Sequence, residues 1–258
     1  LLVVMLFTPH AAQADYTNDY YYTVTNNEVT ITGHDGAGGD IVIPDLLGGF
    51  PVKGIGDSAF SGKTNITSAV IPDSITDIGW YAFRSCSALT NVIIGDSVTS
   101  IGEASFEYCS GLTNVIIGDS VTSIGNGSFA NCSRLASVTI GNSIRSIGQR
   151  AFSSNTNLTS IVLPDSVTSL GGSVFCGCSG LTNVIIGNGI SRIGWFEFGG
   201  CSGLTNILIP NSVTSIERNA FWHCTGLSSM NIPDSVVSID VGAFEGCTGL
   251  TNMVVGIG

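Results

Sequence analysis

The chain has 258 residues, of which 43% are hydrophobic, only 10% are charged and 34 are glycine. Soluble domains usually carry about a quarter charged residues, so this composition indicates many tight turns rather than a layered globule. The formal net charge is −11 and the basic residues are scattered singly. We therefore expect no nucleic-acid partner, because phosphate binding requires clustered Lys and Arg.

The chain begins with features of a secretory signal peptide. Residues 1–7 form an apolar run that is too short to span a bilayer, and Ala12-Gln13-Ala14 gives an A-x-A pattern before Asp15. We expect a partial signal peptide over residues 1–14, lacking its basic region and initiator Met, and a secreted or cell-surface protein. A buried core strand is the alternative. No other apolar run approaches membrane-helix length, so we expect no membrane insertion.

Residues 15–50 are predicted to form an N-terminal β cap. Alternating runs at Tyr20–Val24 and Val29–Ile31 flank Asn26-Asn27, which is a hairpin signal. Repeat proteins require caps that cover the core of the first repeat.

From residue 51 onward the sequence repeats every 23 residues. Phenylalanine marks nine units in strict register, at Phe60, Phe83, Phe106, Phe129, Phe152, Phe175, Phe198, Phe221 and Phe244. Cysteine marks seven of them, at Cys86, Cys109, Cys132, Cys178, Cys201, Cys224 and Cys247, with Asn155 at the same position in another. A repeat of this length predicts a solenoid whose units share one core.

Each unit contains a short strand. Leu89–Ile94 reads L-x-x-V-x-I, the strand pattern of leucine-rich repeats, and alternation directs Val92 and Ile94 inward. A Gly or Pro ends the strand, an Asp/Asn-Ser pair starts a turn by side-chain-to-backbone hydrogen bonding, and Gly-x-x-x-Phe is expected to form a short helical or 3₁₀ turn. The sequence therefore predicts a leucine-rich-repeat horseshoe with a parallel sheet over residues 51–258, of about nine units. No polar cap follows, so we expect the natural protein to continue.

Residues 232–251, which read I-P-D-S-V-V-S-I-D-V-G-A-F-E-G-C-T-G-L-T, resemble the BspA-type leucine-rich repeat proteins. Residues 40–60 resemble the entry segment of that family. The resemblance covers about residues 40–258 and implies a secreted or surface-attached protein of bacteria or some protozoa, with several members associated with adhesion or host-protein binding. It implies no shared catalytic residues.

The residues with chemical potential are better explained by structure. The cysteines occupy a core position, so we expect buried free thiols rather than disulfides, and Cys176 with Cys178 lacks the neighbours of a metal site. The Asp/Asn column at 73, 96, 119, 142, 165, 188, 211 and 234 could offer Ca²⁺ ligands, but the exchange of Asp with Asn favours turn initiation. Only three His are present. We therefore predict no catalytic residues, no metal and no cofactor.

The outward strand positions are the candidate binding site. One column is an amide and hydroxyl ridge and the next is largely apolar, and an exposed apolar stripe is typical of interaction surfaces. Repeat drift with β-branched residues kept for strand propensity is the alternative. The predicted binding residues are Asn91, Ile93, Asn114, Ile116, Ser160, Val162, Asn183, Ile185, Asn206 and Leu208.

These patterns predict a monomeric, non-catalytic protein that binds a protein or glycan along its repeated face. A structural or ice-binding array is an alternative, since Thr67, Thr90, Thr113, Thr159, Thr182, Thr205 and Thr251 form a ladder, although horseshoe curvature fits a flat ice plane badly. A solenoid-borne glycan-active enzyme is another, although the strand face carries no acids.

Overall fold

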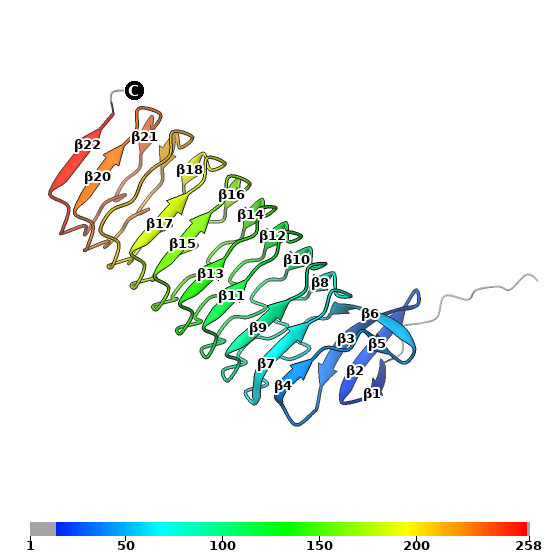
Figure 1. Cartoon of the computed structure of the whole chain (residues 1–258). Coiled ribbons are helices and arrows are strands. Elements are labelled where there is room, and N and C mark those ends of the chain that lie inside the picture. The colour runs from blue at the N-terminus through cyan, green and yellow to red at the C-terminus, as the bar shows by residue number, and fades with distance from the viewer. Residues whose placement is uncertain (1–13, 257–258) are drawn as a thin grey trace, which may run out of the picture.

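The computed structural model describes residues 14–256, which form a parallel β-solenoid of 22 strands without helices. We call each 23-residue turn of the solenoid a rung. The rungs stack along one axis with little curvature, and the N-terminal cap covers one end (Figure 1). The predicted signal peptide lies outside the described residues, apart from Ala14, the first residue of β1.

The cap consists of antiparallel strands β1 (Ala14–Thr17), β2 (Tyr20–Thr25) and β3 (Glu28–His34). Asn26 and Asn27 connect β2 to β3 with φ angles of 53° and 64°. Both are left-handed, as a two-residue hairpin turn of type I′ requires. The predicted hairpin is therefore confirmed, and β1 is a further strand that the sequence pattern did not indicate.

The cap joins the repeats through three strands, β4 (Gly39–Val42), β5 (Leu46–Leu47) and β6 (Phe50–Ile55). β6 runs parallel to β3 on one side and to β8 on the other, whereas β4 pairs with β7. β5 is a short antiparallel partner of β6. Residues 39–55 therefore begin both sheets of the solenoid.

The first sheet carries the longer strands. After β4 these are β7 (Ile66–Ile71), β9 (Asn91–Ile94), β11 (Asn114–Ile116), β13 (Ser137–Thr139), β15 (Ser160–Leu163), β17 (Asn183–Ile186), β20 (Ser229–Ile232) and β22 (Asn252–Val255). The parallel pairs between repeats are offset by one 23-residue unit, as between Asn91 and Asn114. The strands of this wall form three hydrogen-bonded segments, β4 to β13, β15 with β17, and β20 with β22. The predicted parallel pairing and its register are confirmed.

The second sheet consists of two-residue strands. They are β8 (Asp77–Ile78), β10 (Ser100–Ile101), β12 (Ser123–Ile124), β14 (Ser146–Ile147), β16 (Ser169–Leu170), β18 (Arg192–Ile193), β19 (Ser215–Ile216) and β21 (Ser238–Ile239). β6 to β16 continue the cap sheet, and β18, β19 and β21 form a separate segment.

The third wall differs from the expected helical turn. Alternate backbone N–H groups bond to the next rung, as from Phe60 N to Ala82 O at 2.7 Å. The N–H groups between them close single turns three residues back, as from Ser61 N to Ser58 O at 3.0 Å, and no continuous helix forms. Each rung instead has two left-handed residues, with φ between 49° and 77°. They form column 1 (residues 58, 81, 104, 127, 150, 173, 196, 219 and 242) and column 2 (residues 62, 85, 108, 131, 154, 177, 200, 223 and 246).

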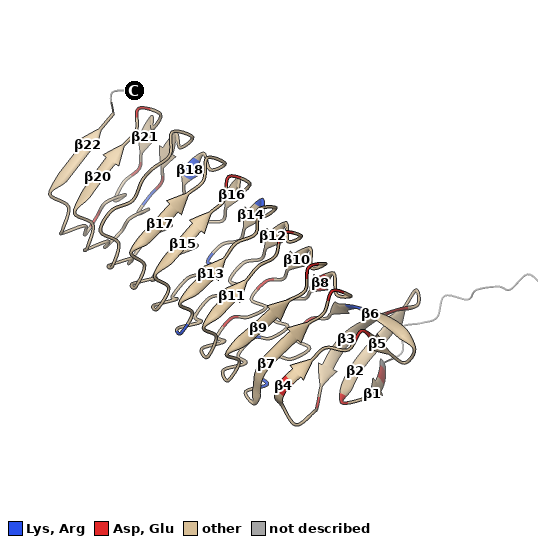
Figure 2. Ribbon diagram, viewed as in Figure 1, with Lys and Arg blue, Asp and Glu red and all other residues tan. Residues whose placement is uncertain are grey.

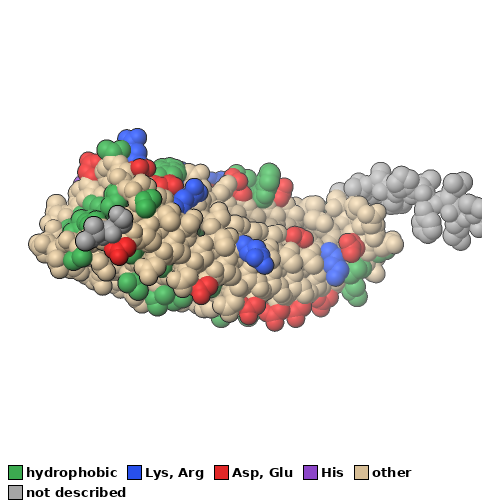
Figure 3. Space-filling model, turned by 90° about the horizontal axis from the view of Figure 1, so that it is seen from above, with side chains coloured by type: hydrophobic (Ala, Val, Ile, Leu, Met, Phe, Trp, Pro, Cys, Tyr) green, Lys and Arg blue, Asp and Glu red, His purple; other side chains and the backbone are tan. Residues whose placement is uncertain are grey.

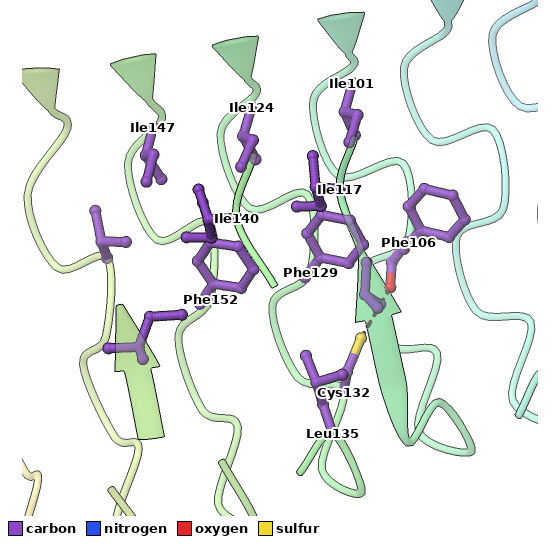
Figure 4. Packing of buried hydrophobic residues seen from close by; sticks show 14 of the residues in the cluster. Ile101, Phe106, Ile117, Ile124, Phe129, Cys132, Leu135, Ile140, Ile147 and Phe152 are labelled. Carbon is purple, nitrogen blue, oxygen red and sulfur yellow. Dashed lines mark hydrogen bonds between the residues drawn. The ribbon is translucent and has the colours of Figure 1, made fainter. Parts of the chain in front are cut away.

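The core is a stack of phenylalanine rings behind this wall. Successive rings from Phe60 to Phe244 lie nearly parallel, with centroids 4.7–5.9 Å apart. Isoleucines and leucines of both sheets pack around the rings (Figure 4). At the N-terminal end the stack contacts His34, whose ring centroid lies 5.5 Å from that of Phe60 and 4.9 Å from that of Tyr20. The cap therefore continues the aromatic core.

Candidate functional site

The outer surface of the first sheet, here the strand face, holds all ten residues predicted for binding. Strands β9, β15 and β17 alternate between exposed and buried side chains, so that Val92 and Ile94 enter the core while Asn91 and Ile93 face solvent. Of the predicted residues only Asn114 is partly covered, and the other nine are exposed. Asn206 and Leu208 lie outside a regular strand, but Leu208 bridges to Asn231 in the same parallel sense.

An apolar column runs along the strand face. Ile93, Ile116, Val162, Ile185 and Leu208 each expose 52–73% of their surface, although they are large aliphatic residues. Val42 and Val254 extend the column towards its ends, and Thr139 and Asn231 interrupt it. Beside Val162 and Ile185, where their strands end, lies a hollow of about 570 Å³ that Pro164 and Asn142 also line. The strand face therefore exposes a row of aliphatic side chains, spaced by the strands, that a partner could contact.

A polar column runs beside the apolar one. It begins at Asp40 of β4, an exposed acid on the strand face, so the expectation that this face carries no acids is wrong at its first strand. The Asp40 carboxylate accepts hydrogen bonds from Ser68 Oγ at 2.7 Å and Thr67 Oγ1 at 2.8 Å. These bonds lower the pKa of Asp40. Further along, Ser137 donates to the side-chain oxygen of Asn114 in the neighbouring rung. The polar side chains thus bond across rungs.

The threonine ladder has a structural role in this geometry. Thr90 Oγ1 donates to the carbonyl oxygen of Thr67, one rung earlier, at 3.0 Å, and Thr113 and Thr182 repeat the arrangement. The hydroxyl donors are therefore directed at the backbone. Because the stack has little curvature (Figure 1), horseshoe curvature no longer argues against an ice-binding face. Bonds of this kind account for four of the seven threonines of the ladder, Thr90, Thr113, Thr182 and Thr251.

The cysteines are free thiols, and six of the seven in the repeated column are fully buried, as expected for core packing. The structure adds a role that the sequence did not indicate. Each of the seven thiols donates to the carbonyl oxygen of the Phe 26 residues earlier, at 3.0–3.2 Å. Asn155 fills the gap in the column with its amide, which donates to Phe129 O at 3.0 Å.

The side chains of the aspartate column accept hydrogen bonds from the backbone of the next rung. The predicted hydrogen bond from each side chain to the backbone of its own turn is therefore wrong at three positions. The Asp96 N–H donates to Asp73 Oδ1 at 2.7 Å. Asp119 and Asp165 accept in the same way from the residue 23 positions later. The rungs are only one strand spacing apart, which brings the next unit's N–H within reach.

The described residues give little support to metal or charge-driven chemistry. Residues 14–256 contain no group of three or more His, Cys, Asp or Glu placed to hold a metal ion. Acidic residues lie mainly at the turns along the edges of the stack (Figure 2), and basic side chains are spread out rather than gathered into one patch (Figure 3). Within the same range no helix could cross a bilayer.

One buried carboxyl was missed by the sequence interpretation. Glu197 has 0% exposure in a column otherwise filled by Ala, Ser and Val, and neither of its carboxyl oxygens makes a hydrogen bond of full geometry. Burial raises the pKa of Glu197 to about 8. The signal that could have found it is the break in a column of small residues, which includes Ala151 and Ala220.

Comparison with known proteins supports the repeat assignment. The family model described as BspA type leucine rich repeat region, in six copies, matches residues 53–182 and 170–256. A comparison with curated proteins finds no match.

Several solved structures are similar. The T. pallidum leucine-rich repeat protein is 25% identical with a TM-score of 0.58, over 92% of this chain and 91% of its own. The pneumococcal vaccine antigen PcpA is 21% identical with a TM-score of 0.58, over 95% of this chain and 82% of its own. A leucine rich cell surface protein from Faecalibacterium prausnitzii is 26% identical with a TM-score of 0.47, over 95% of both chains.

Proposed function

The chain belongs to the BspA-type leucine-rich repeat family, and we propose that it is a non-catalytic binding protein whose strand face engages a partner outside the cell. The family supports a repeat-based binding role. The signal-peptide pattern of residues 1–14 supports secretion or attachment to the cell surface. Of the protein and glycan partners that the sequence leaves open, a protein is favoured by the strand face.

The apolar column carries this proposal. Ile93, Ile116, Val162, Ile185 and Leu208 remain exposed on a sheet whose backbone positions are fixed by its neighbours. Side chains held in this way lose little conformational entropy when a partner covers them. Burial of aliphatic surface contributes about 25 cal/mol for each Å², so a partner that covers the column gains affinity from several side chains at once. The neighbouring polar column would supply hydrogen bonds at the rim.

The test replaces three members of the apolar column together, as Ile93→Ser, Ile116→Ser and Ile185→Ser. The matched control replaces exposed apolar residues of the other walls, as Trp80→Ser, Val237→Ser and Val241→Ser. Both triple variants and the parent chain are applied to an array of extracellular proteins and glycans, and surface plasmon resonance measures every protein that the parent binds.

We expect the strand-face variant to lose at least about tenfold in affinity, equivalent to about 1.4 kcal/mol, while the control binds like the parent. Thermal unfolding of both variants should stay close to that of the parent, because the replaced side chains are exposed. Equal binding by the parent and the strand-face variant would contradict the proposed function.

A further inference from the structure

A groove lies on the wall of left-handed turns, outside the strand face. It has a volume of about 710 Å³ and runs from Tyr81, Arg84 and Tyr108 at one end to Arg150 at the other. Tyr81 and Arg150 occupy the same position three rungs apart, so the groove is about 14 Å long at the usual spacing of parallel strands. We refer to it as the turn-face groove.

The groove exists because small residues separate large ones along column 1. Tyr81 is followed one rung later by Ala104, then by Gly127 and then by Arg150. Ala130 supplies a third small side chain to the lining. The hollow is therefore specific to these rungs and is not a property of the repeat.

One end of the groove is a rigid aromatic and guanidinium cluster. Arg84 Nε donates to Glu107 Oε2 at 2.7 Å, and this bond raises the pKa of Arg84. The Arg84 Cζ atom lies 5.5 Å from the ring centroid of Tyr81 and 5.5 Å from that of Tyr108. The guanidinium therefore holds both rings in place, while 46% of the Tyr108 surface remains exposed. A surface fixed in this way is organised before a ligand arrives.

The remaining lining is polar and balanced in charge. Two basic side chains, Arg84 and Arg150, are matched by two acidic ones, Glu103 and Glu107. The uncharged hydrogen-bonding groups include the amides of Asn126, Asn131 and Gln149. Planar amides, carboxylates and guanidinium groups together offer both donors and acceptors. This balance, in a chain of net charge −11, disfavours an acidic ligand.

We propose that the turn-face groove binds a neutral oligosaccharide. The C–H face of a sugar ring is apolar and stacks on a tyrosine ring, whereas its hydroxyl groups donate and accept hydrogen bonds around the ring edge. Tyr108 and Tyr81 provide the first kind of contact, and the amides of Asn126, Asn131 and Gln149 provide the second. The inference does not rest on the proposed role of the strand face, because the two surfaces share no residue.

The test measures binding of maltotetraose, cellotetraose, mannotetraose and chitotetraose by isothermal titration calorimetry, with a heparin tetrasaccharide as the charged comparator. The variants are Tyr108→Asn and Tyr81→Ser, since Asn131 and Ser58 occupy the equivalent left-handed positions in other rungs. Ala104→Tyr fills the groove from a column position where Tyr81 already shows that tyrosine is accommodated. His223→Asn is the matched control, because His223 lies in column 2 outside the groove.

We expect at least one neutral tetrasaccharide to bind with a Kd below about 1 mM. Tyr108→Asn, Tyr81→Ser and Ala104→Tyr should each weaken that binding at least about tenfold, and His223→Asn should leave it unchanged. Absence of binding by all four neutral sugars, stronger binding of the heparin tetrasaccharide, or equal binding by the groove variants would overturn the proposal.

Discussion

The thiol of Cys132 donates a hydrogen bond to the backbone carbonyl oxygen of Phe106, at a distance of 3.2 Å (Figure 4). Because the same bond recurs along the column, it ties each rung to an earlier one inside the apolar core. The Phe106 carbonyl also accepts from the Cys109 N–H at 3.2 Å, so the thiol satisfies its second lone pair, and such a bond contributes about 1 kcal/mol. This explains why the repeat keeps Cys in place of an aliphatic residue of similar size, and why Asn is accepted at residue 155.

Asn155→Cys should stabilise the protein by about 1 kcal/mol. The Asn155 amide donates to Phe129 O at 3.0 Å and to Phe152 O at 2.9 Å, but its own Oδ1 is buried without a partner. Cysteine would keep the bond to Phe129 O and remove the unsatisfied oxygen, and Phe152 O would still accept from the Cys178 thiol. The midpoint of urea unfolding measures the effect. Cys132→Val is the matched opposite, which should lower stability by about 1 kcal/mol because it removes the donor. A less stable Asn155→Cys variant would refute this account.

Ser85→Gly should raise stability, by roughly 0.5 kcal/mol. Ser85 has a φ of 60°, a conformation that costs an L-residue about 1–2 kcal/mol, and this gain exceeds the added chain entropy of glycine. Gly62 occupies the same position in another rung, and a Cβ there would meet nothing within 4 Å. Gly62→Ala should therefore lose about 1 kcal/mol from backbone strain alone.

Thermal unfolding compares these variants with Ser87→Gly. Ser87 is an exposed turn residue without a positive φ, so glycine should destabilise the protein there. Equal effects of glycine at Ser85 and Ser87 would show that the left-handed backbone carries no strain.

The register of the fold was predictable because one period controls it. Phe60 and its equivalents repeat every 23 residues, and parallel pairing of identical units then places Asn91 beside Asn114. The inward and outward sides of each strand followed from alternation. The third wall was less predictable, since Gly-x-x-x-Phe suits a helical turn as well as a pair of left-handed residues. The Gly, Asn and Ser found at column 2 positions are the signal that distinguishes the two.

The candidate sites divide in the same way. The strand-face column was visible because Ile93 and Ile185 recur with the period. The turn-face groove could not be predicted from the sequence, because it depends on Tyr81, Ala104 and Gly127, which differ from rung to rung. These residues form a groove only when the rungs are stacked. Sequence periodicity reveals the residues that recur in every rung, whereas a local site such as this groove is formed by residues that differ between rungs.

Acid should loosen the N-terminal cap through His34. Burial, followed by the charge of Lys63, lowers the pKa of His34, while Asp19 and Asp35 act in the opposite direction. A lowered folded-state pKa means that the stability from neutral His34 is present above the ordinary histidine pKa of 6.5 and is lost as the pH falls below it. Hydrogen exchange of the β2 and β3 amides should therefore accelerate between pH 7 and pH 5, after correction for the intrinsic exchange rate.

His34→Phe should remove this acceleration, because phenylalanine extends the aromatic stack without a titrating group. His223→Asn is the matched control, since His223 is exposed and far from the cap in the chain. Acceleration that persists in His34→Phe would assign the effect to another group.

Glu197 should give the opposite pH dependence in the distal half of the stack. Burial raises the pKa of Glu197 to about 8 in the folded protein, against an ordinary value of 4.5. The Val174 backbone N–H opposes this rise in pKa, Glu217 adds to it and Arg192 opposes it. Since the folded-state pKa is raised, the protein takes up a proton on folding between these values. Stability is therefore fully present below pH 4.5 and is lost as the pH rises through about 8.

Glu197→Ala supplies the side chain that Ala151 and Ala220 have at the same position, and should remove this loss. At pH 8 the variant should be more stable than the parent by an amount on the order of a few kcal/mol, and the difference should shrink towards pH 5. Urea unfolding measures the difference, and exchange of the Phe175 N–H, which donates to Glu197 O at 3.1 Å, reports it locally. Glu245→Gln, at an exposed carboxylate, is the control. If the stabilities of the parent and Glu197→Ala changed with pH in parallel, ionisation of the Glu197 carboxyl would not destabilise the folded protein.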